Sequence, residues 1–231
     1  MQNQVEFKVS GKYALFSDPL TKIGGEKFSY SVPTYSALVG ICEAIYWKPT
    51  FIWVIDDVRI MNRTERKSIG TRPISLYDSE KPIMSLYNYL TDVEYQVRAH
   101  FEWDYDQEKL AYDRIDKKHW EIAKRWIKKG GHRKVFLGTS ECVAYVEQCT
   151  FGEGKGYYDT SGSMDLGIML HGITYATKSD LMQYVRLWDC VMENGVIHFP
   201  RPEECTIVRP AGRGSWKEFE NKEETGNELD E

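Results

Sequence analysis

The chain has no apolar run that approaches the roughly 18 to 20 residues of a membrane span. Its start, Met1 to Gln4, lacks the charged and hydrophobic regions of a secretory signal. We therefore expect a cytoplasmic protein with no membrane partner. The five cysteines form no CxxC pair and are odd in number, which argues against a disulfide scaffold and a zinc knuckle. We expect them to be reduced thiols in the core.

The common short motifs of metal, nucleotide and serine enzymes are also missing. The sequence contains no HExxH, no HxE with PCxxC, no P-loop GxxxxGK[ST] and no G-x-S-x-G elbow. The segment 152–156 (GEGKG) lacks the hydroxyl residue and the strand-to-helix context of a P-loop. It is either a flexible loop or a turn that grips a phosphate. We expect no metal and no cofactor.

The composition is that of a folded protein with unevenly placed charge. Of the 231 residues 42% are hydrophobic and 28% charged, which excludes disorder over the whole chain. The net charge of −5 equals that of the last segment, 215–231, which holds two lysines and seven acids. The segment 111–134 instead carries nine lysines and arginines against three acids, a net charge of +6. A local basic surface suited to nucleic acid is therefore compatible with an acidic total.

Hydrophobic periodicity predicts the fold class. Alternating apolar residues indicate strands, and apolar residues three and four apart indicate helices. In chain order the predicted elements are a strand at 5–9, a helix from Pro33 to about Lys48, a central strand at 51–61, a strand at 93–103, a helix at 115–127, and strands at 135–137 and 143–146. This β-α-β-β-α-β order predicts an α+β protein with a ferredoxin-like domain.

The composition changes after residue 150. Strand-like runs lie at 166–175 and 184–192, and Asn194-Gly195 joins the second of these to 196–199 as a tight hairpin. We expect a ferredoxin-like domain at 1–150, a small antiparallel β-domain at 151–213, and an acidic, disordered tail at 214–231.

The strongest chemical candidate is the pair Lys118-His119 inside the basic segment. Histidine changes charge near neutral pH, and cleavage of RNA by its own 2′-hydroxyl needs a base, an acid and positive charge on the phosphate. His119 is a candidate for either proton transfer and Lys118 for the charge, while the phenol of Tyr46 would orient the 2′-hydroxyl or help to move its proton. The alternative is that His119 and Tyr46 are simply core residues.

Several longer segments resemble one known family. They are 14–27 (ALFSDPLTKIGGEK), 29–35 (SYSVPTY), 45–50 (IYWKPT), 135–138 (VFLG) and 199–203 (FPRPE). In this order they resemble the CRISPR-associated RAMP endoribonuclease of type I-C, the Dvulg subtype. The resemblance runs from the N-terminus to about Arg209 and leaves the acidic tail out.

The resemblance implies a RAMP fold and a defined activity. Proteins of this family cut CRISPR repeat RNA at the base of its stem-loop without metal, leaving a 2′,3′-cyclic phosphate and a 5′-hydroxyl. They then stay on the crRNA 5′ handle beside the other subunits of a type I-C Cascade. The family's catalytic tyrosine corresponds to Tyr46 and its lysine-histidine pair to Lys118 and His119. The expected RNA-binding residues are Lys22, Gly24, Gly25, Lys27, Lys117, Lys124, Arg125, Lys128, Lys129, His132, Arg133 and Lys134.

Two other functions remain open from the sequence. One is a non-catalytic subunit that binds the crRNA handle, as some RAMP relatives do. The other is a metal-dependent DNA nuclease, for which only scattered carboxylates are present, such as Asp56-Asp57, which we place at solvated strand ends.

Overall fold

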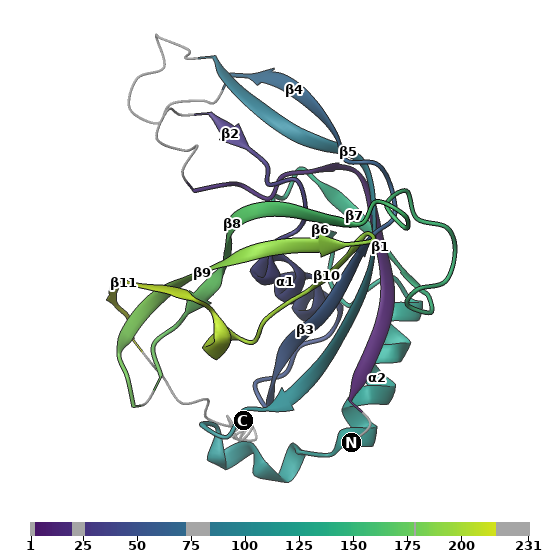
Figure 1. Ribbon diagram of the computed structural model, residues 1–231. Helices are drawn as coiled ribbons and strands as arrows, with labels where there is room; N and C mark the ends of the chain where they lie inside the picture. The colour runs from purple at the N-terminus through teal and green to yellow at the C-terminus, as the bar shows by residue number, and fades with distance from the viewer. Residues whose placement is uncertain (1–2, 20–25, 73–83, 178, 216–231) are drawn as a thin grey trace, which may run out of the picture.

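The computed structural model describes residues 3–19, 26–72, 84–177 and 179–215. In chain order its elements are β1 (Gln4–Ala14), β2 (Lys27–Phe28), α1 (Tyr35–Ile45), β3 (Phe51–Ile60), β4 (Glu65–Thr71), β5 (Ser85–Trp103), the 3-10 helix η2 (Glu108–Asp113), α2 (Asp116–Lys128), β6 (Val135–Phe136), β7 (Val143–Gln148), β8 (Ser163–Thr174), β9 (Met182–Glu193), β10 (Val196–His198), the 3-10 helix η3 (Pro202–Glu204) and β11 (Ile207–Arg213). Figure 1 shows a long twisted sheet with α1 and α2 behind it.

The centre of the sheet has the predicted ferredoxin-like arrangement. Strands β3, β5, β1 and β7 lie side by side in that order, and each pairs antiparallel with its neighbour. This is the order that a β-α-β-β-α-β chain forms when each helix crosses over one intervening strand. The α+β prediction is therefore confirmed. β3 has a strand on both sides, as its nearly continuous apolar sequence predicts.

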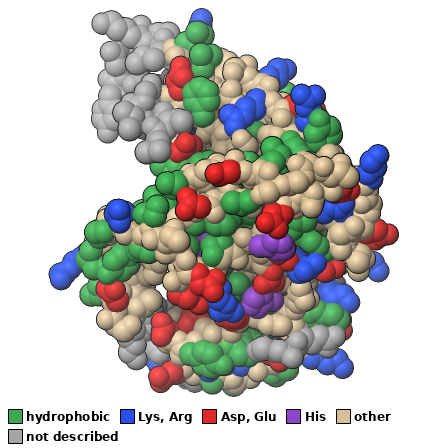
Figure 2. Space-filling view, viewed as in Figure 1, with side chains coloured by type: hydrophobic (Ala, Val, Ile, Leu, Met, Phe, Trp, Pro, Cys, Tyr) green, Lys and Arg blue, Asp and Glu red, His purple; other side chains and the backbone are tan. Residues whose placement is uncertain are grey.

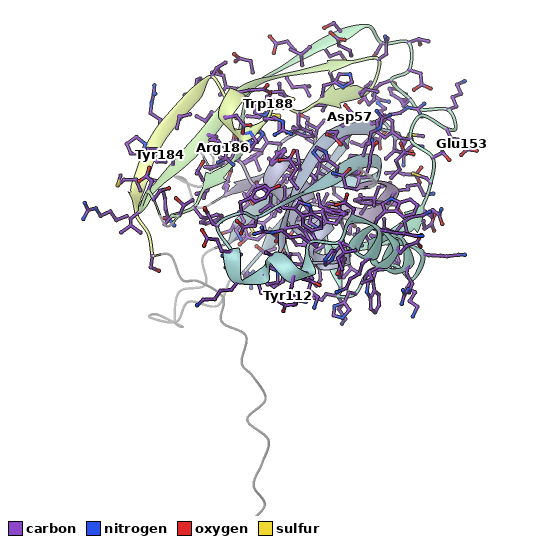
Figure 3. All side chains as sticks on the ribbon, turned by 90° about the horizontal axis from the view of Figure 1, so that it is seen from below. Asp57, Tyr112, Glu153, Tyr184, Arg186 and Trp188 are labelled. Atoms are coloured by element: carbon purple, nitrogen blue, oxygen red, sulfur yellow. The ribbon has the colours of Figure 1, made fainter. Side chains whose placement is uncertain are left out.

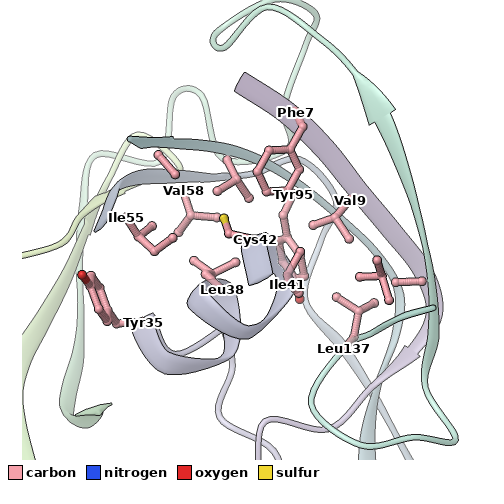
Figure 4. Close-up of a cluster of buried hydrophobic side chains, with 14 of the residues drawn as sticks. Phe7, Val9, Tyr35, Leu38, Ile41, Cys42, Ile55, Val58, Tyr95 and Leu137 are labelled. Atoms are coloured by element: carbon pink, nitrogen blue, oxygen red, sulfur yellow. The ribbon is translucent and has the colours of Figure 1, made fainter. Parts of the chain in front are cut away.

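The core lies between this sheet and α1. Helix α1 buries its predicted apolar face, formed by Leu38, Ile41, Cys42 and Ile45. Figure 4 shows Leu38, Ile41 and Cys42 directed at residues of β1, β3 and β5, with Phe7, Val58 and Tyr95 among them. Burying a side chain of this size stabilises the fold by about 1.5 to 3 kcal/mol, so the α1 face contributes strongly to holding the helix in place.

Helix α1 is shorter than predicted. It begins after Thr34, whose hydroxyl accepts a hydrogen bond from Ala37 N at 3.3 Å, and it ends at Ile45 rather than near Lys48. A residue directly before proline disfavours the helical conformation, which excludes Lys48. The backbone becomes extended at Tyr46 (φ −161°, ψ 126°). This change of direction brings the following residues to the candidate site.

The C-terminal strands form the second β unit. β8 and β11 pair with β9, and Asn194 and Gly195 take positive φ angles of 48° and 81° between β9 and β10. The predicted Asn-Gly hairpin is therefore confirmed. β10 then pairs with β3, so the second unit continues the central sheet. Figure 3 shows Arg186 and Trp188 of this unit side by side on β9. The division at residue 150 stays a prediction, and 216–231 lie outside the described residues.

Several strands were not predicted, and their positions explain why. β4 pairs with residues 85–91 of β5 in a ribbon that extends beyond the central sheet (Figure 1). Because β4 is exposed along nearly its whole length, its residues show no regular alternation of apolar and polar types. Asp92, with a φ of 49°, interrupts β5 between this ribbon and the central sheet. The sequence therefore revealed only the second half of β5.

The expectation that Asp56 and Asp57 are solvated strand ends is wrong. Both lie inside β3, next to a register shift between Ile55 and Asp57. Asp57 is buried, pairs with Arg98 at 3.0 Å and contacts His198. Asp56 accepts from His100 Nδ1 at 2.9 Å. Figure 2 shows histidine, acidic and basic side chains gathered over the middle of the face in view. The carboxylates are therefore bound in ion pairs.

Other expectations concern cysteines and membranes. Cys42, Cys142, Cys190 and Cys205 are buried, Cys149 is half-buried, and all five are free thiols. In the parts of the chain that the structure describes, no helix is long and apolar enough to cross a membrane.

Candidate active site

The structure brings the three predicted catalytic residues together. Tyr46 follows the last turn of α1, and Lys118 and His119 lie in the first turn of α2. The phenol Oη of Tyr46 lies 2.9 Å from Nδ1 of His119. On the other side of the imidazole, Nε2 lies 2.7 Å from the carbonyl oxygen of Asp113. Residues 73 positions apart in sequence thus form one hydrogen-bonded chain.

These contacts determine the tautomer of His119. A carbonyl oxygen only accepts hydrogen bonds, so Nε2 must carry the proton that it donates to Asp113. In the neutral ring Nδ1 is then an acceptor, and the Tyr46 hydroxyl donates to it. The lone pairs of the Tyr46 oxygen remain available to accept a hydrogen bond from another hydroxyl group.

His119 itself does not reach solvent. Its exposed fraction is 0%, and the rings of Phe51, Phe101 and Trp103 surround it in edge-to-face contacts with centroid distances of 5.3, 6.2 and 5.6 Å. The sequence alternative that His119 is buried is thus confirmed in its geometry. Any effect of His119 on a bound ligand has to pass through Tyr46, whose exposed fraction is 6%.

Asp113 organises the site, and sequence reasoning missed it. Its carboxylate accepts from Thr50 Oγ1 at 3.1 Å, forms an ion pair with Lys118, and lies 3.4 Å from Nε2 of His119. Burial by itself raises the pKa of Asp113, but the hydrogen bonds from Lys118 and Thr50 and the neighbouring positive charge together hold it below its usual range. Thr50 lies in the same IYWKPT segment as Tyr46, which was the available signal.

Tyr46 is held in its protonated form. Burial, followed by the negative charge of Asp113, raises the pKa of its phenol to about 12. A phenol with such a pKa is a poor base alone, so it can accept a proton at neutral pH only if its own proton moves on. The hydrogen bond to Nδ1 of His119 provides that acceptor.

A pocket of about 320 Å³ opens beside Tyr46. It is lined by Glu43, Tyr46, Trp47, Lys48, Ile122, Trp126, His132 and Arg133. Lys118, Ile122 and Trp126 are four residues apart on α2 and therefore share one helix face. This places Lys118 one turn before the pocket wall. Two of the predicted RNA-binding residues, His132 and Arg133, thus share a pocket with the predicted catalytic tyrosine.

The glycine loop is attached to the end of α1. Gly130 and Gly131 take positive φ angles of 85° and 109°, which favour glycine. The backbone N–H groups of His132 and Arg133 then donate to the carbonyl oxygens of Ile45 and Ala44 at 3.1 and 2.9 Å. These carbonyls belong to the last turn of α1 and need such partners. The loop is therefore held directly beside Tyr46.

The other predicted RNA-binding residues are spread more widely. Lys117, Lys124, Arg125 and Lys128 are exposed on α2, Lys129 is exposed directly after its last residue, and Lys134 follows the glycine loop. Lys124 covers the Trp120 ring at 4.0 Å in a separate groove between α2 and β1. Lys27 lies over the Tyr87 ring at 4.6 Å on β2, far from α2 (Figure 1). Lys22, Gly24 and Gly25 lie outside the described residues.

The sheet order and the second β unit define an α+β protein of the RAMP class. A family model described as "CRISPR-associated protein (Cas_Cas5)" matches residues 4–200. The chain therefore belongs to the CRISPR-associated Cas5 family, which confirms the resemblance found in the sequence.

Relatives of known name or structure agree with this assignment. A protein of Thermus thermophilus named "CRISPR pre-crRNA endoribonuclease Cas5d" is 34% identical over 183 residues, 74% of each chain. A protein of the same name from Mannheimia succiniciproducens is 29% identical over 225 residues, 87% of this chain and 96% of the relative. A crystal structure named as a CRISPR-associated protein has a TM-score of 0.75 and 36% identity, covering 90% of this chain and 97% of its own.

Proposed function

We propose that this chain is a metal-independent endoribonuclease that cuts CRISPR repeat RNA at the base of its stem-loop. The names of the two sequence relatives support pre-crRNA processing. The observation that carries the proposal is the hydrogen-bonded chain from Tyr46 through His119 to Asp113. Its Tyr46 end lies in the wall of a pocket that also contains a lysine and an arginine. After cleavage the protein stays on the crRNA 5′ handle as a subunit of a type I-C Cascade.

The first half of the reaction is the attack of the 2′-hydroxyl on the adjacent phosphate. The Tyr46 oxygen accepts the hydrogen of this hydroxyl while the phenol passes its own proton to Nδ1 of His119. The imidazole then carries a positive charge next to the Asp113 carboxylate, 3.4 Å from Nε2, which stabilises the charged form. His119 thus accepts the proton without touching the RNA.

Positive charge near the pocket stabilises the phosphorane. Lys118 is half exposed and paired with Asp113, and Arg133 and Lys48 line the pocket. Cations placed beforehand around developing negative charge lower the barrier because they need not reorganise during the reaction. Asp113 holds Lys118 beside the site until the phosphate arrives.

RNA binding would extend beyond the pocket. The exposed cations of α2 and the glycine loop would contact phosphates, together with Lys22, Gly24, Gly25 and Lys27. The narrow major groove of an A-form stem is difficult to read, so recognition would depend on stem shape and on the unpaired flank. Trp47 and Trp126 in the pocket wall are suited to stack on such unpaired bases.

A second candidate function is a crRNA-handle-binding subunit without catalysis. The complete burial of His119 favours it, because a histidine that meets only protein atoms can serve packing alone. In that case the basic surface would still bind the handle, but the repeat RNA would remain intact.

The decisive experiment uses a synthetic repeat RNA with one 2′-deoxy nucleotide before the cut. Because this substitution removes the nucleophile and keeps the phosphates, we expect binding to persist and cleavage to disappear. The unmodified RNA should be cut in excess EDTA, and end mapping should find a 2′,3′-cyclic phosphate and a 5′-hydroxyl. Cleavage of the deoxy RNA would mean that water is the nucleophile. An uncut normal RNA would instead support the handle-binding subunit.

A further inference from the structure

The proposed site accounts for only one of the two proton transfers. Breaking the bond between phosphorus and the 5′-oxygen leaves an alkoxide that needs a proton. Both nitrogens of His119 are occupied, one by Tyr46 and one by the Asp113 carbonyl, and its exposed fraction is 0%. His119 can therefore receive the first proton through Tyr46 but cannot reach the 5′-oxygen on the far side of the phosphate.

His132 lines the same pocket as Tyr46 and, unlike His119, has an exposed side chain. Its backbone N–H donates to Ile45 at 3.1 Å, and Ile45 is the residue directly before Tyr46. The edge of its ring meets the Trp126 ring, with a centroid distance of 4.6 Å. The backbone of His132 is therefore fixed at the residue before Tyr46, and its ring lies in the wall of the pocket that Tyr46 also lines.

The other polar groups at the pocket suit a proton donor less well. Arg133 does not release its proton in proteins. Lys118 is engaged by the Asp113 carboxylate, and an ammonium group such as that of Lys48 is ordinarily a much weaker acid than an imidazolium. Glu43 is the competing acid, because burial raises its pKa. A carboxylate, however, is repelled by the phosphate it would serve, whereas protonated imidazole is attracted to it.

We propose that His132 is the general acid of the reaction, an inference that rests on the proposed endoribonuclease function. The 2′-oxygen forms a bond to phosphorus, and its proton passes to Tyr46 as the phenol proton passes to His119. The bond from phosphorus to the 5′-oxygen breaks, and its electron pair takes a proton from the His132 imidazolium. The products are the cyclic phosphate, a 5′-hydroxyl, protonated His119 and neutral His132. No oxidant, reductant or added reactant is needed.

The test compares two synthetic repeat RNAs, one normal and one with sulfur in place of the bridging 5′-oxygen at the cut. A thiolate leaves without prior protonation because thiols are far stronger acids than alcohols. His132→Ala should slow cleavage of the normal RNA by about 10²- to 10⁴-fold, the usual contribution of acid-base catalysis. With the sulfur RNA the same variant should regain nearly the wild-type rate. Tyr46→Phe should remain slow on both RNAs.

His132→Arg is the matched control for phosphate binding, because it keeps a positive charge but cannot donate a proton. We expect it to be slow on the normal RNA and restored on the sulfur RNA, like His132→Ala. A normal rate for His132→Arg would show that the loop only needs charge, and an equal loss on both RNAs would show a role other than proton donation. Restoration of Glu43→Gln or Lys118→Ala, with no restoration of the His132 variants, would assign the acid elsewhere. Each of these results overturns the proposal.

The same assay separates this proposal from the proposed function. If the wild-type protein leaves the normal RNA uncut or cuts the 2′-deoxy RNA, the endoribonuclease mechanism fails. If the wild-type protein behaves as proposed and the His132 variants match it in rate, only the assignment of His132 fails. Because His132 is exposed and its loop is held by backbone hydrogen bonds, its substitution should leave the fold intact, which circular dichroism of each variant would check.

Discussion

Each end of α1 carries a tyrosine next to a fully buried histidine, but the two pairs differ in their surroundings. At the start of the helix, Tyr35 stacks on His171 with a centroid distance of 3.9 Å. At its end, the Tyr46 hydroxyl hydrogen-bonds to His119 at 2.9 Å. Both histidines have an exposed fraction of 0%. Burial and a tyrosine partner therefore do not distinguish the histidine of the proposed active site from the other buried histidine.

The charge next to the ring does distinguish them. Burial, followed by the positive charge of Arg186, lowers the pKa of His171 to about 4, although its hydrogen bond to the Pro200 carbonyl opposes the shift. His171 is thus neutral at physiological pH. Its hydrogen-bond partners among the described residues are the Pro200 carbonyl and Arg186, and none is a carboxylate. His119 instead has the Asp113 carboxylate 3.4 Å from Nε2. A positive charge on the ring would therefore face a carboxylate only at His119.

Tyr46→Phe should slow cleavage more than any other substitution at the two tyrosine-histidine pairs. It removes the oxygen that joins the pocket to His119, so we expect the single-turnover cleavage rate to fall by about 10²- to 10⁴-fold with RNA affinity little changed. Because Tyr46 and His119 act as a unit, adding His119→Ala should cost little more. Tyr35→Phe is the matched control, and a comparable loss of rate in that variant would contradict the assignment of the two pairs.

Lys118→Ala should have the next largest effect. Removal of a cation aimed at the phosphorane typically slows a reaction by about 10²- to 10³-fold. Lys117 is the matched control. It is exposed on α2 and, unlike Lys118, forms no ion pair with a carboxylate in the part of the chain that the structure describes. Lys117→Ala should mainly weaken RNA binding, and the rates at saturating RNA would separate the two variants. A larger rate loss for Lys117→Ala would place the family's catalytic lysine one residue earlier.

Much of this comparison was accessible from the sequence. The alternation in 93–103 and the helical spacing in 115–127 came from one-sided burial, which leaves a regular pattern. Tyr46, Lys118 and His119 lie in segments that resemble the family, and the structure places them in one cluster. The catalytic role of that cluster remains a proposal.

The parts that could not be predicted depend on contacts between distant segments. Asp113 was counted only as an acid within a basic segment, because its role depends on Thr50, which lies 63 residues away in the chain. The pocket could not be foreseen either, since it forms only when the loop at His132 pairs with the end of α1. Exposed strands such as β4 leave no clear pattern because nearly all of their residues face solvent.

The free energy of unfolding should depend on pH through His171. Its pKa of about 4 in the folded chain is below the ordinary histidine value of about 6.5, so the unfolded chain binds this proton first as the pH falls. Stability is therefore complete above about pH 6.5 and decreases toward pH 4, where the loss reaches about 3 kcal/mol. Urea unfolding of wild type and His171→Gln at pH 7 and pH 4 measures it. An equal pH dependence in both proteins would contradict the buried neutral state.

Two threonines provide the smallest and most selective test, because each serves one end of α1. Thr50→Val removes one hydrogen bond to the Asp113 carboxylate while Lys118 remains. A hydrogen bond to a charged group is worth about 1.5 kcal/mol. If the activation free energy rises by that amount, the cleavage rate falls about tenfold. Thr34→Val removes the cap of α1, which should cost about 1 kcal/mol of stability and leave the rate unchanged. Thermal unfolding and single-turnover cleavage measured on both variants separate the two effects. If Thr34→Val slows cleavage as much as Thr50→Val does, the rate follows the stability of the whole protein. The proposal that Asp113 organises the active site would then be contradicted.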